Sequence, residues 1–195
     1  MKIGVLALQG DFAAHGRMLT KLGYDWCEVR RPVQLDETDG LILPGGESST
    51  MIKFIREEGF LEPLREYARS GKVMFGTCAG AILLANQVTN PEQESLAVID
   101  IGVQRNGYGR QLDSFTTHVS VPTLGDEPVE LVFIRAPIIT HLGEGVEVLV
   151  EHNGTPVMVR QGHILAATFH PELTADTRIH ALFAEQIQPV VSQPA

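Results

Sequence analysis

The sequence lacks any run of about 18 consecutive apolar residues, which a membrane-spanning helix needs, so no membrane span is expected. Its apolar N-terminal stretch, residues 3–8, is followed at once by Gln9, Gly10 and Asp11, and is too short for a signal peptide. Positive charge is also scarce, since 15 Lys and Arg against 24 Asp and Glu give a formal net charge of −9. This deficit argues against nucleic acid or an anionic membrane surface as a partner.

Cysteine is scarce as well, because the 195 residues contain only Cys27 and Cys78. The two form no C-x-x-C motif, and a single bridge would be a poor framework for a secreted domain. None of the seven histidines has a cysteine or another histidine at the close spacing of a local zinc motif. We therefore expect no metal site, and a location in the reducing cytoplasm, where a free thiol persists.

Strands and helices alternate over the first 86 residues. The predicted strands are residues 3–8, 24–29, 40–43 and 72–75, and the predicted helices are residues 12–22, 51–57, 61–70 and 79–85. Continuous apolar strands of this kind are typical of a parallel sheet that is buried on both faces. The alternation predicts an α/β fold with right-handed crossovers.

The second half is richer in extended segments. These are residues 98–104, joined through a Gly-rich turn at Asn106-Gly107 to 114–121, then 129–134, 146–151, 155–160 and 164–169. Asn153-Gly154 predicts a hairpin, and residues 174–186 a final helix. Residues 189–195 carry two prolines and no charge, which predicts a frayed tail. We expect one domain over residues 1–195, with a mixed, mostly parallel sheet and an antiparallel extension in the second half.

A strand-to-helix turn with the sequence Gly76-Thr77-Cys78-Ala79-Gly80 is the first candidate site. The pattern G-x-C-x-G parallels the G-x-S-x-G turn that exposes a nucleophilic serine. A helix N-terminus also favours the thiolate, the reactive form of a cysteine. The motif alone is weak, because many cysteines are merely small core residues.

Two further loops contain groups that a thiol nucleophile needs. In His170-Pro171-Glu172, an extended backbone would put residues i and i+2 on one side, so that the carboxylate orients the imidazole. A surface histidine before a turn is the alternative. In Gly45-Gly46, unobstructed backbone N–H groups suit an oxyanion, with the Gly46 and Ala79 N–H groups as the expected donors.

The Gly45-Gly46 loop is also compatible with an ordinary turn in which Ser48 or Ser49 is the helix N-cap. A phosphate-binding loop is excluded, because no Gly-Lys-Ser/Thr follows. If residues 164–169 run parallel to the other strands, the loops with Gly46, Cys78 and His170 meet at one edge of the sheet.

These loops, in this order, resemble the class I (triad) glutamine amidotransferases, and more closely the family of glutaminase subunits of pyridoxal 5′-phosphate synthase. The resemblance covers nearly the whole chain, in residues 4–10, 41–51, 75–80, 105–115, 133–137, 151–154 and 169–174. It implies a three-layer, flavodoxin-like fold. It also implies Cys78 as nucleophile, His170 as base and Glu172 as its partner. The implied L-glutamine site consists of Gly46, Glu47, Ser48, Arg105, Ile134 and Arg135.

The resemblance further implies a separate synthase partner, a (β/α)8 barrel, in an assembly with twelve copies of each subunit. Ammonia would pass inside the complex to build a pyridine ring from a pentose phosphate and a triose phosphate. No cofactor is implied. Three alternatives remain: a glutaminase for another synthase, a partner-independent cysteine hydrolase of γ-glutamyl compounds, and a non-enzymatic interaction subunit. The block at residues 105–115 argues against the first, and the intact Cys78, His170 and Glu172 against the third.

Overall fold

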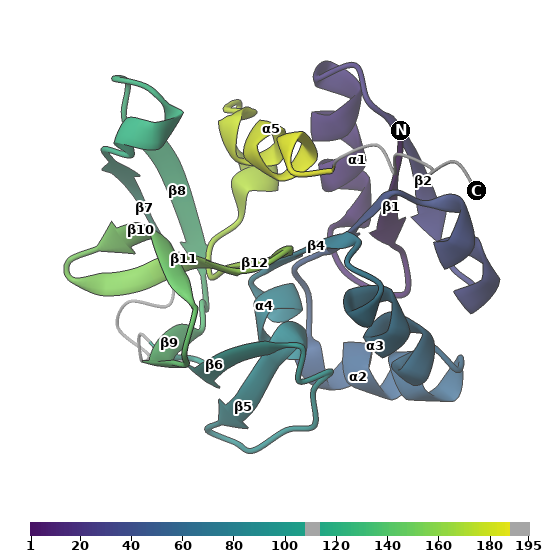
Figure 1. The fold of residues 1–195 in the computed structure, drawn as a ribbon. Coiled ribbons are helices and arrows are strands. Elements are labelled where there is room, and N and C mark those ends of the chain that lie inside the picture. The colour runs from purple at the N-terminus through teal and green to yellow at the C-terminus, as the bar shows by residue number, and fades with distance from the viewer. Residues whose placement is uncertain (108–113, 188–195) are drawn as a thin grey trace.

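A seven-stranded sheet with the order β10-β11-β12-β4-β3-β1-β2 forms the centre of the computed structural model, which describes residues 1–107 and 114–187 (Figure 1). The strands are β1 (Lys2–Leu6), β2 (Asp25–Val29), β3 (Gly40–Leu43), β4 (Val73–Thr77), β10 (Glu147–His152), β11 (Thr155–Gln161) and β12 (Ile164–Ala167). Neighbours from β12 to β2 are parallel, whereas β11 is antiparallel to both β10 and β12. The predicted mixed, mostly parallel sheet is therefore confirmed.

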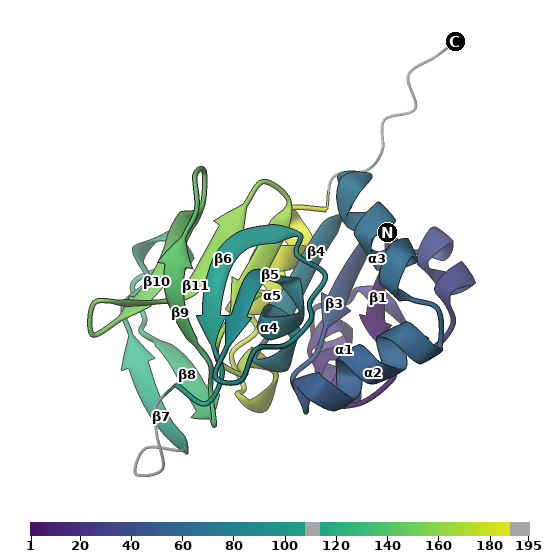
Figure 2. The same cartoon turned by 90° about the horizontal axis from the view of Figure 1, so that it is seen from below.

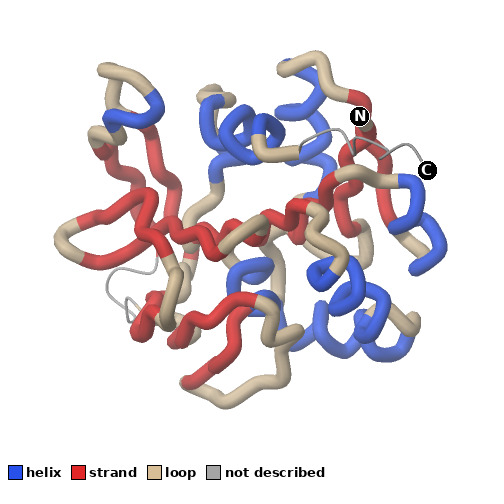
Figure 3. The backbone as a smooth tube through the Cα atoms, viewed as in Figure 1, coloured by secondary structure: helices blue, strands red, loops and turns tan. Residues whose placement is uncertain are grey.

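Helices cover both faces of this sheet and give three layers (Figures 1 and 3). On one face lie α1 (Phe12–Lys21) and α5 (Arg178–Glu185), and on the other α2 (Ser48–Glu57), α3 (Leu61–Arg69) and α4 (Ala79–Leu84). Successive strand residues point to opposite faces, so Met74 and Phe75 of β4 belong to different cores. Because both faces are covered, the central strands are mostly apolar. Among the described residues no helix has the length and hydropathy of a membrane span.

Two smaller sheets lie beside the central one (Figure 2). One contains β5 (Ala85–Thr89), β6 (Ile99–Gln104) and β9 (Ile138–Leu142), and the other is an antiparallel pair of β7 (Ser114–Val119) and β8 (Val129–Ile134). Short 3₁₀ helices are η1 (Pro32–Glu37), η2 (Pro122–Leu124) and η3 (Pro171–Leu173). Sequence reasoning missed β5, β9 and η1. The two strands predicted on either side of the Asn106-Gly107 turn belong to different sheets.

Several predicted boundaries were wrong. Helix α2 begins at Ser48, and its N-cap is Glu47 rather than a serine, because the Glu47 side chain accepts the Ser49 N–H at 3.2 Å. Helix α5 begins at Arg178 rather than residue 174, because the Thr174 hydroxyl accepts the Asp176 N–H at 3.1 Å in a local turn. The predicted tail, residues 189–195, lies outside the described residues, as does most of the 105–115 block.

The carboxyl ends of β3, β4 and β12 meet at one edge, since the three strands are adjacent and parallel. This confirms the predicted direction of the strand that precedes His170. The loops after these strands therefore lie together, as expected of ligand-binding loops in an open α/β sheet.

Candidate active site

Cys78 lies at a strained turn between β4 and α4. Its backbone has φ 48° and ψ −103°, a region that side-chain-bearing residues rarely adopt, and its N–H donates to Ala167 O of β12 at 2.8 Å. A Cβ on Gly80 would lie 2.1 Å from Leu43 O, so only glycine allows α4 to approach β3 this closely. This is the geometry of a nucleophile elbow with a cysteine at its tip.

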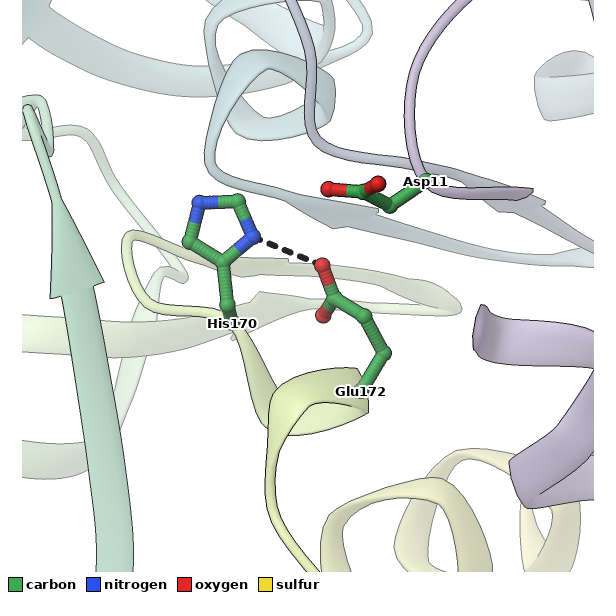
Figure 4. Close-up of side chains that lie close together, drawn as sticks. All are labelled: Asp11, His170 and Glu172. Carbon is green, nitrogen blue, oxygen red and sulfur yellow. Dashed lines mark hydrogen bonds and ion pairs between the residues drawn. The ribbon is translucent and has the colours of Figure 1, made fainter. Parts of the chain in front are cut away.

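His170 and Glu172 form a buried pair at the end of β12. His170 Nδ1 lies 2.6 Å from Glu172 Oε1 (Figure 4), and the His170 backbone N–H donates to Val132 O of β8 at 2.8 Å. The predicted extended geometry is wrong in one respect, because Pro171 starts the 3₁₀ helix η3 and Glu172 lies within it. The two side chains nevertheless face each other.

The charge state of His170 depends on its two neighbours. Burial by itself disfavours the imidazolium, but hydrogen bonds and attraction from Cys78 and Glu172 raise the pKa of His170 to about 10. A positively charged His170 next to the sulfur stabilises a thiolate, which is the nucleophilic form of cysteine. In the thiol form, Cys78 Sγ is directed at Ile134 O, at 3.9 Å.

A pocket of about 270 Å³ opens in front of Cys78 and His170. It brings together all six residues that the sequence predicts for glutamine binding: Gly46, Glu47, Ser48, Arg105, Ile134 and Arg135. Its other lining residues are Gln9, Asp11, Ile82 and Asn106, which sequence reasoning did not assign. Gln9 and Asp11 follow β1 at the same edge of the sheet, so the rule used for the other loops could have found them.

The pocket contains charges of both signs. Arg105 Nη2 lies 3.0 Å from Glu47 Oε1, and the Arg105 side chain is mostly buried. Hydrogen bonds from Ser49, together with the charges of Arg105 and Arg135, hold the pKa of Glu47 below its usual value. A small zwitterion would therefore meet both a carboxylate and guanidinium groups in this pocket.

The Gly45-Gly46 loop packs directly against His170 and Cys78. The Gly45 carbonyl accepts the Asp11 N–H at 3.1 Å, and the Glu47 N–H donates to Gln9 Oε1 at 2.9 Å. A Cβ on Gly45 would lie 2.5 Å from His170 Cε1, so glycine is required at this position. The loop after β1 thus fixes the backbone beside Cys78.

Asp11, His170 and Glu172 bring potential metal-ligand atoms within 4.8 Å of one another (Figure 4). Within this group, His170 Nδ1 and Glu172 Oε1 already contact each other at 2.6 Å. The arrangement therefore suits a carboxylate-oriented imidazole better than a metal centre.

A model of the SNO glutamine amidotransferase family matches residues 5–189. The chain belongs to this family. It is 56% identical over 190 residues to the pyridoxal 5′-phosphate synthase subunit PdxT of Koribacter versatilis. The aligned region covers 96% of this chain and 96% of the relative. It is 50% identical to the subunit of the same name from Thermotoga neapolitana, over 96% of this chain and all of the relative.

Solved structures agree with this family assignment. A crystal structure described as a glutamine amidotransferase superimposes with a TM-score of 0.90 at 48% identity, over 95% of this chain and 98% of the other. The likeness confirms the predicted glutamine amidotransferase fold.

Proposed function

We propose that this chain is the glutaminase subunit of a pyridoxal 5′-phosphate synthase and hydrolyses L-glutamine to L-glutamate and ammonia. The observation that carries the proposal is the turn at Cys78 beside the His170–Glu172 pair. Both lie at a pocket that is lined by positively and negatively charged side chains. Membership of the glutamine amidotransferase family and the names of the most similar relatives support it.

In the proposed reaction the Cys78 thiolate attacks the side-chain amide carbon of glutamine. Protonated His170 gives its proton to the departing nitrogen, so ammonia leaves and a thioester forms. His170, now neutral, takes a proton from water, whose hydroxide oxygen attacks the thioester. Glutamate is released and the thiolate–imidazolium pair is restored. Glu172 keeps the imidazole oriented throughout, because it accepts from Nδ1.

The oxyanion of each tetrahedral intermediate needs two backbone donors, for which we propose Ala79 N–H and Gly46 N–H. The Gly45 carbonyl is held by Asp11 N–H, so turning this peptide requires that bond to break. We infer that docking of the synthase sets the orientation of the peptide and that the isolated subunit is a poor glutaminase.

The proposed substrate contacts follow from charge. Arg105 and Arg135 suit the α-carboxylate of glutamine, and Glu47 suits its α-ammonium group. Gly46, Ser48 and Ile134 complete the wall of the pocket. A volume of about 270 Å³ is near the lower end for small-molecule sites, which fits a single amino acid.

The proposed partner is a (β/α)8-barrel synthase subunit, in an assembly with twelve copies of each subunit, as the family resemblance implies. Ammonia would pass directly into this partner, because free ammonia would be protonated and lost in water. We further propose that residues 1–195 form one domain that works in the cytoplasm. Cys27 and Cys78 are both free thiols, as a reducing compartment would keep them.

The test is ammonia release from glutamine, with the synthase subunit added or withheld and Cys78→Ala as the control. We expect strong activity only with the synthase and intact Cys78. Activity that survives in Cys78→Ala would refute the mechanism. Turnover of γ-glutamyl peptides without a partner would favour the hydrolase alternative.

A further inference from the structure

Behind the His170–Glu172 pair lies a buried polar cluster that the proposed reaction does not use. Its three residues come from different elements: His15 from α1, Thr77 from the end of β4 and His180 from α5. All three side chains are buried. Polar groups in such a position cost free energy unless they are hydrogen-bonded, so their partners indicate why they are there.

The contacts form a chain that ends at the free oxygen of Glu172. His180 Nε2 lies 2.9 Å from His15 Nδ1, and His15 Nε2 lies 3.1 Å from Thr77 Oγ1. His15 Nε2 is also 3.5 Å from Glu172 Oε2. That oxygen has no hydrogen-bond partner among the described residues, whereas Oε1 is bonded to His170. His15 is therefore the group that faces the unused side of the carboxylate.

The positions of the protons follow from this chain. Burial holds the pKa of His15 well below its usual value and lowers the pKa of His180 to about 4, so both rings are neutral near pH 7. Each neutral ring has one N–H. A hydrogen on His15 Nδ1 would leave a bare Nε2 lone pair facing the Glu172 carboxylate.

With the hydrogen on His15 Nε2, the ring donates toward Thr77 and Glu172, and His15 Nδ1 accepts from His180 Nε2–H. His180 Nδ1 is buried without a partner among the described residues. In this arrangement His180 carries its hydrogen on Nε2, so the unpartnered Nδ1 is a bare acceptor. The opposite tautomer would leave a buried N–H at Nδ1 without an acceptor. The contacts at Glu172 and those at His180 thus favour the same tautomer of His15.

We propose that His15 is a positioning residue for Glu172, and that His180 fixes the tautomer of His15 that donates toward the carboxylate. The proposal rests on the proposed glutaminase function and extends its triad by two residues. Glu172 is then held by the hydrogen bond from His170 on Oε1 and attracted by the nearby Nε2–H dipole of His15 on Oε2. A carboxylate contacted on both sides in this way keeps its orientation toward His170.

The first experiment compares His15→Met with His15→Gln in the complex with the synthase. Methionine fills a similar volume without a donor, whereas glutamine can place an N–H near the position of Nε2. We expect His15→Met to lower kcat about tenfold or more with KM nearly unchanged, and His15→Gln to keep most of the activity.

The matched control is His163→Gln. His163 is also hydrogen-bonded, through Nε2 to Ala68 O at 2.6 Å, but it lies outside the pocket and the buried cluster. Its replacement should leave kcat unchanged. A folded His15→Met variant with wild-type kcat would overturn the proposal.

A second measurement does not depend on activity or on the folding of a variant. ¹⁵N spectra of histidine-labelled wild-type protein distinguish a hydrogen on Nε2 from one on Nδ1. We expect His15 to carry it on Nε2, and a hydrogen on Nδ1 would overturn the proposal. If the wild-type complex released no ammonia, the proposed function would fail, while the spectra would still decide how His15 faces Glu172.

Discussion

The pocket edge of the sheet and the core layer behind it each contain a buried histidine, and the two differ in charge. His170, at the pocket, contacts a sulfur and a carboxylate, which raise its pKa to about 10. His180, in the core, has no such neighbour, and burial lowers its pKa to about 4. Burial therefore does not decide the charge of a histidine by itself. For these two histidines the difference lies in the hydrogen bonds and charges of Cys78 and Glu172, which act on His170 and not on His180.

Replacing Cys78 should have the largest effect on the difference in charge between His170 and His180. We expect Cys78→Ala to lower glutamine hydrolysis by at least about a thousandfold, because no other group would form the covalent intermediate. The pKa of His170 should also fall, since one of the groups that raise it is lost. Ammonia release and an NMR titration of His170 measure the two effects. An unchanged titration would mean that Glu172 alone keeps His170 charged.

Neutralising the carboxylate should be the next most damaging change. Glu172→Gln removes the charge that faces His170 Nδ1 at 2.6 Å, and we expect a loss of about a hundredfold in kcat. The alkaline limb of the pH profile should move down, because His170 would lose its proton at a lower pH. An alkaline limb at the wild-type position would contradict the assigned role of Glu172.

Crowding the pocket edge should have a smaller effect. A methyl group at Gly45 would meet His170 Cε1 at 2.5 Å, so Gly45→Ala should displace the imidazole and lower kcat about tenfold or more. Gly102→Ala is the matched control, because its Cβ would also be crowded, at 3.0 Å from His141 Cβ, but in the separate β5-β6-β9 sheet. Equal kinetic losses in both variants would indicate general destabilisation.

The core histidine His180 should also make the stability of the protein depend on pH. The pKa of His180 is lower in the folded protein, about 4, than its usual 6.5, so the unfolded chain binds more protons. The free energy of unfolding should therefore fall as the pH drops from about 6.5 to about 4, by on the order of 3 kcal/mol from this group. Denaturant unfolding at several pH values measures this. His180→Gln should flatten the slope, and an equal slope in the variant would refute the assignment.

Much of the site could be predicted because its signals are local. The small residues around Cys78 predict a sharp turn, adjacent glycines predict free backbone donors, and His170-Pro171-Glu172 brings a carboxylate near an imidazole over three residues. The alternation of apolar strands with helices predicted the α/β sheet for the same reason. Each of these patterns depends on neighbours in the sequence.

Only the tertiary structure decided which distant segments meet. Strand β5 is held by parallel pairing with β6, which no pattern within residues 85–89 indicates. His15 and His180 are 165 positions apart, yet they lie in contact behind Glu172 because α1 and α5 cover the same face of the sheet. Periodicity in a sequence reports which side of an element is buried, whereas the partner that buries it depends on the packing of the whole chain.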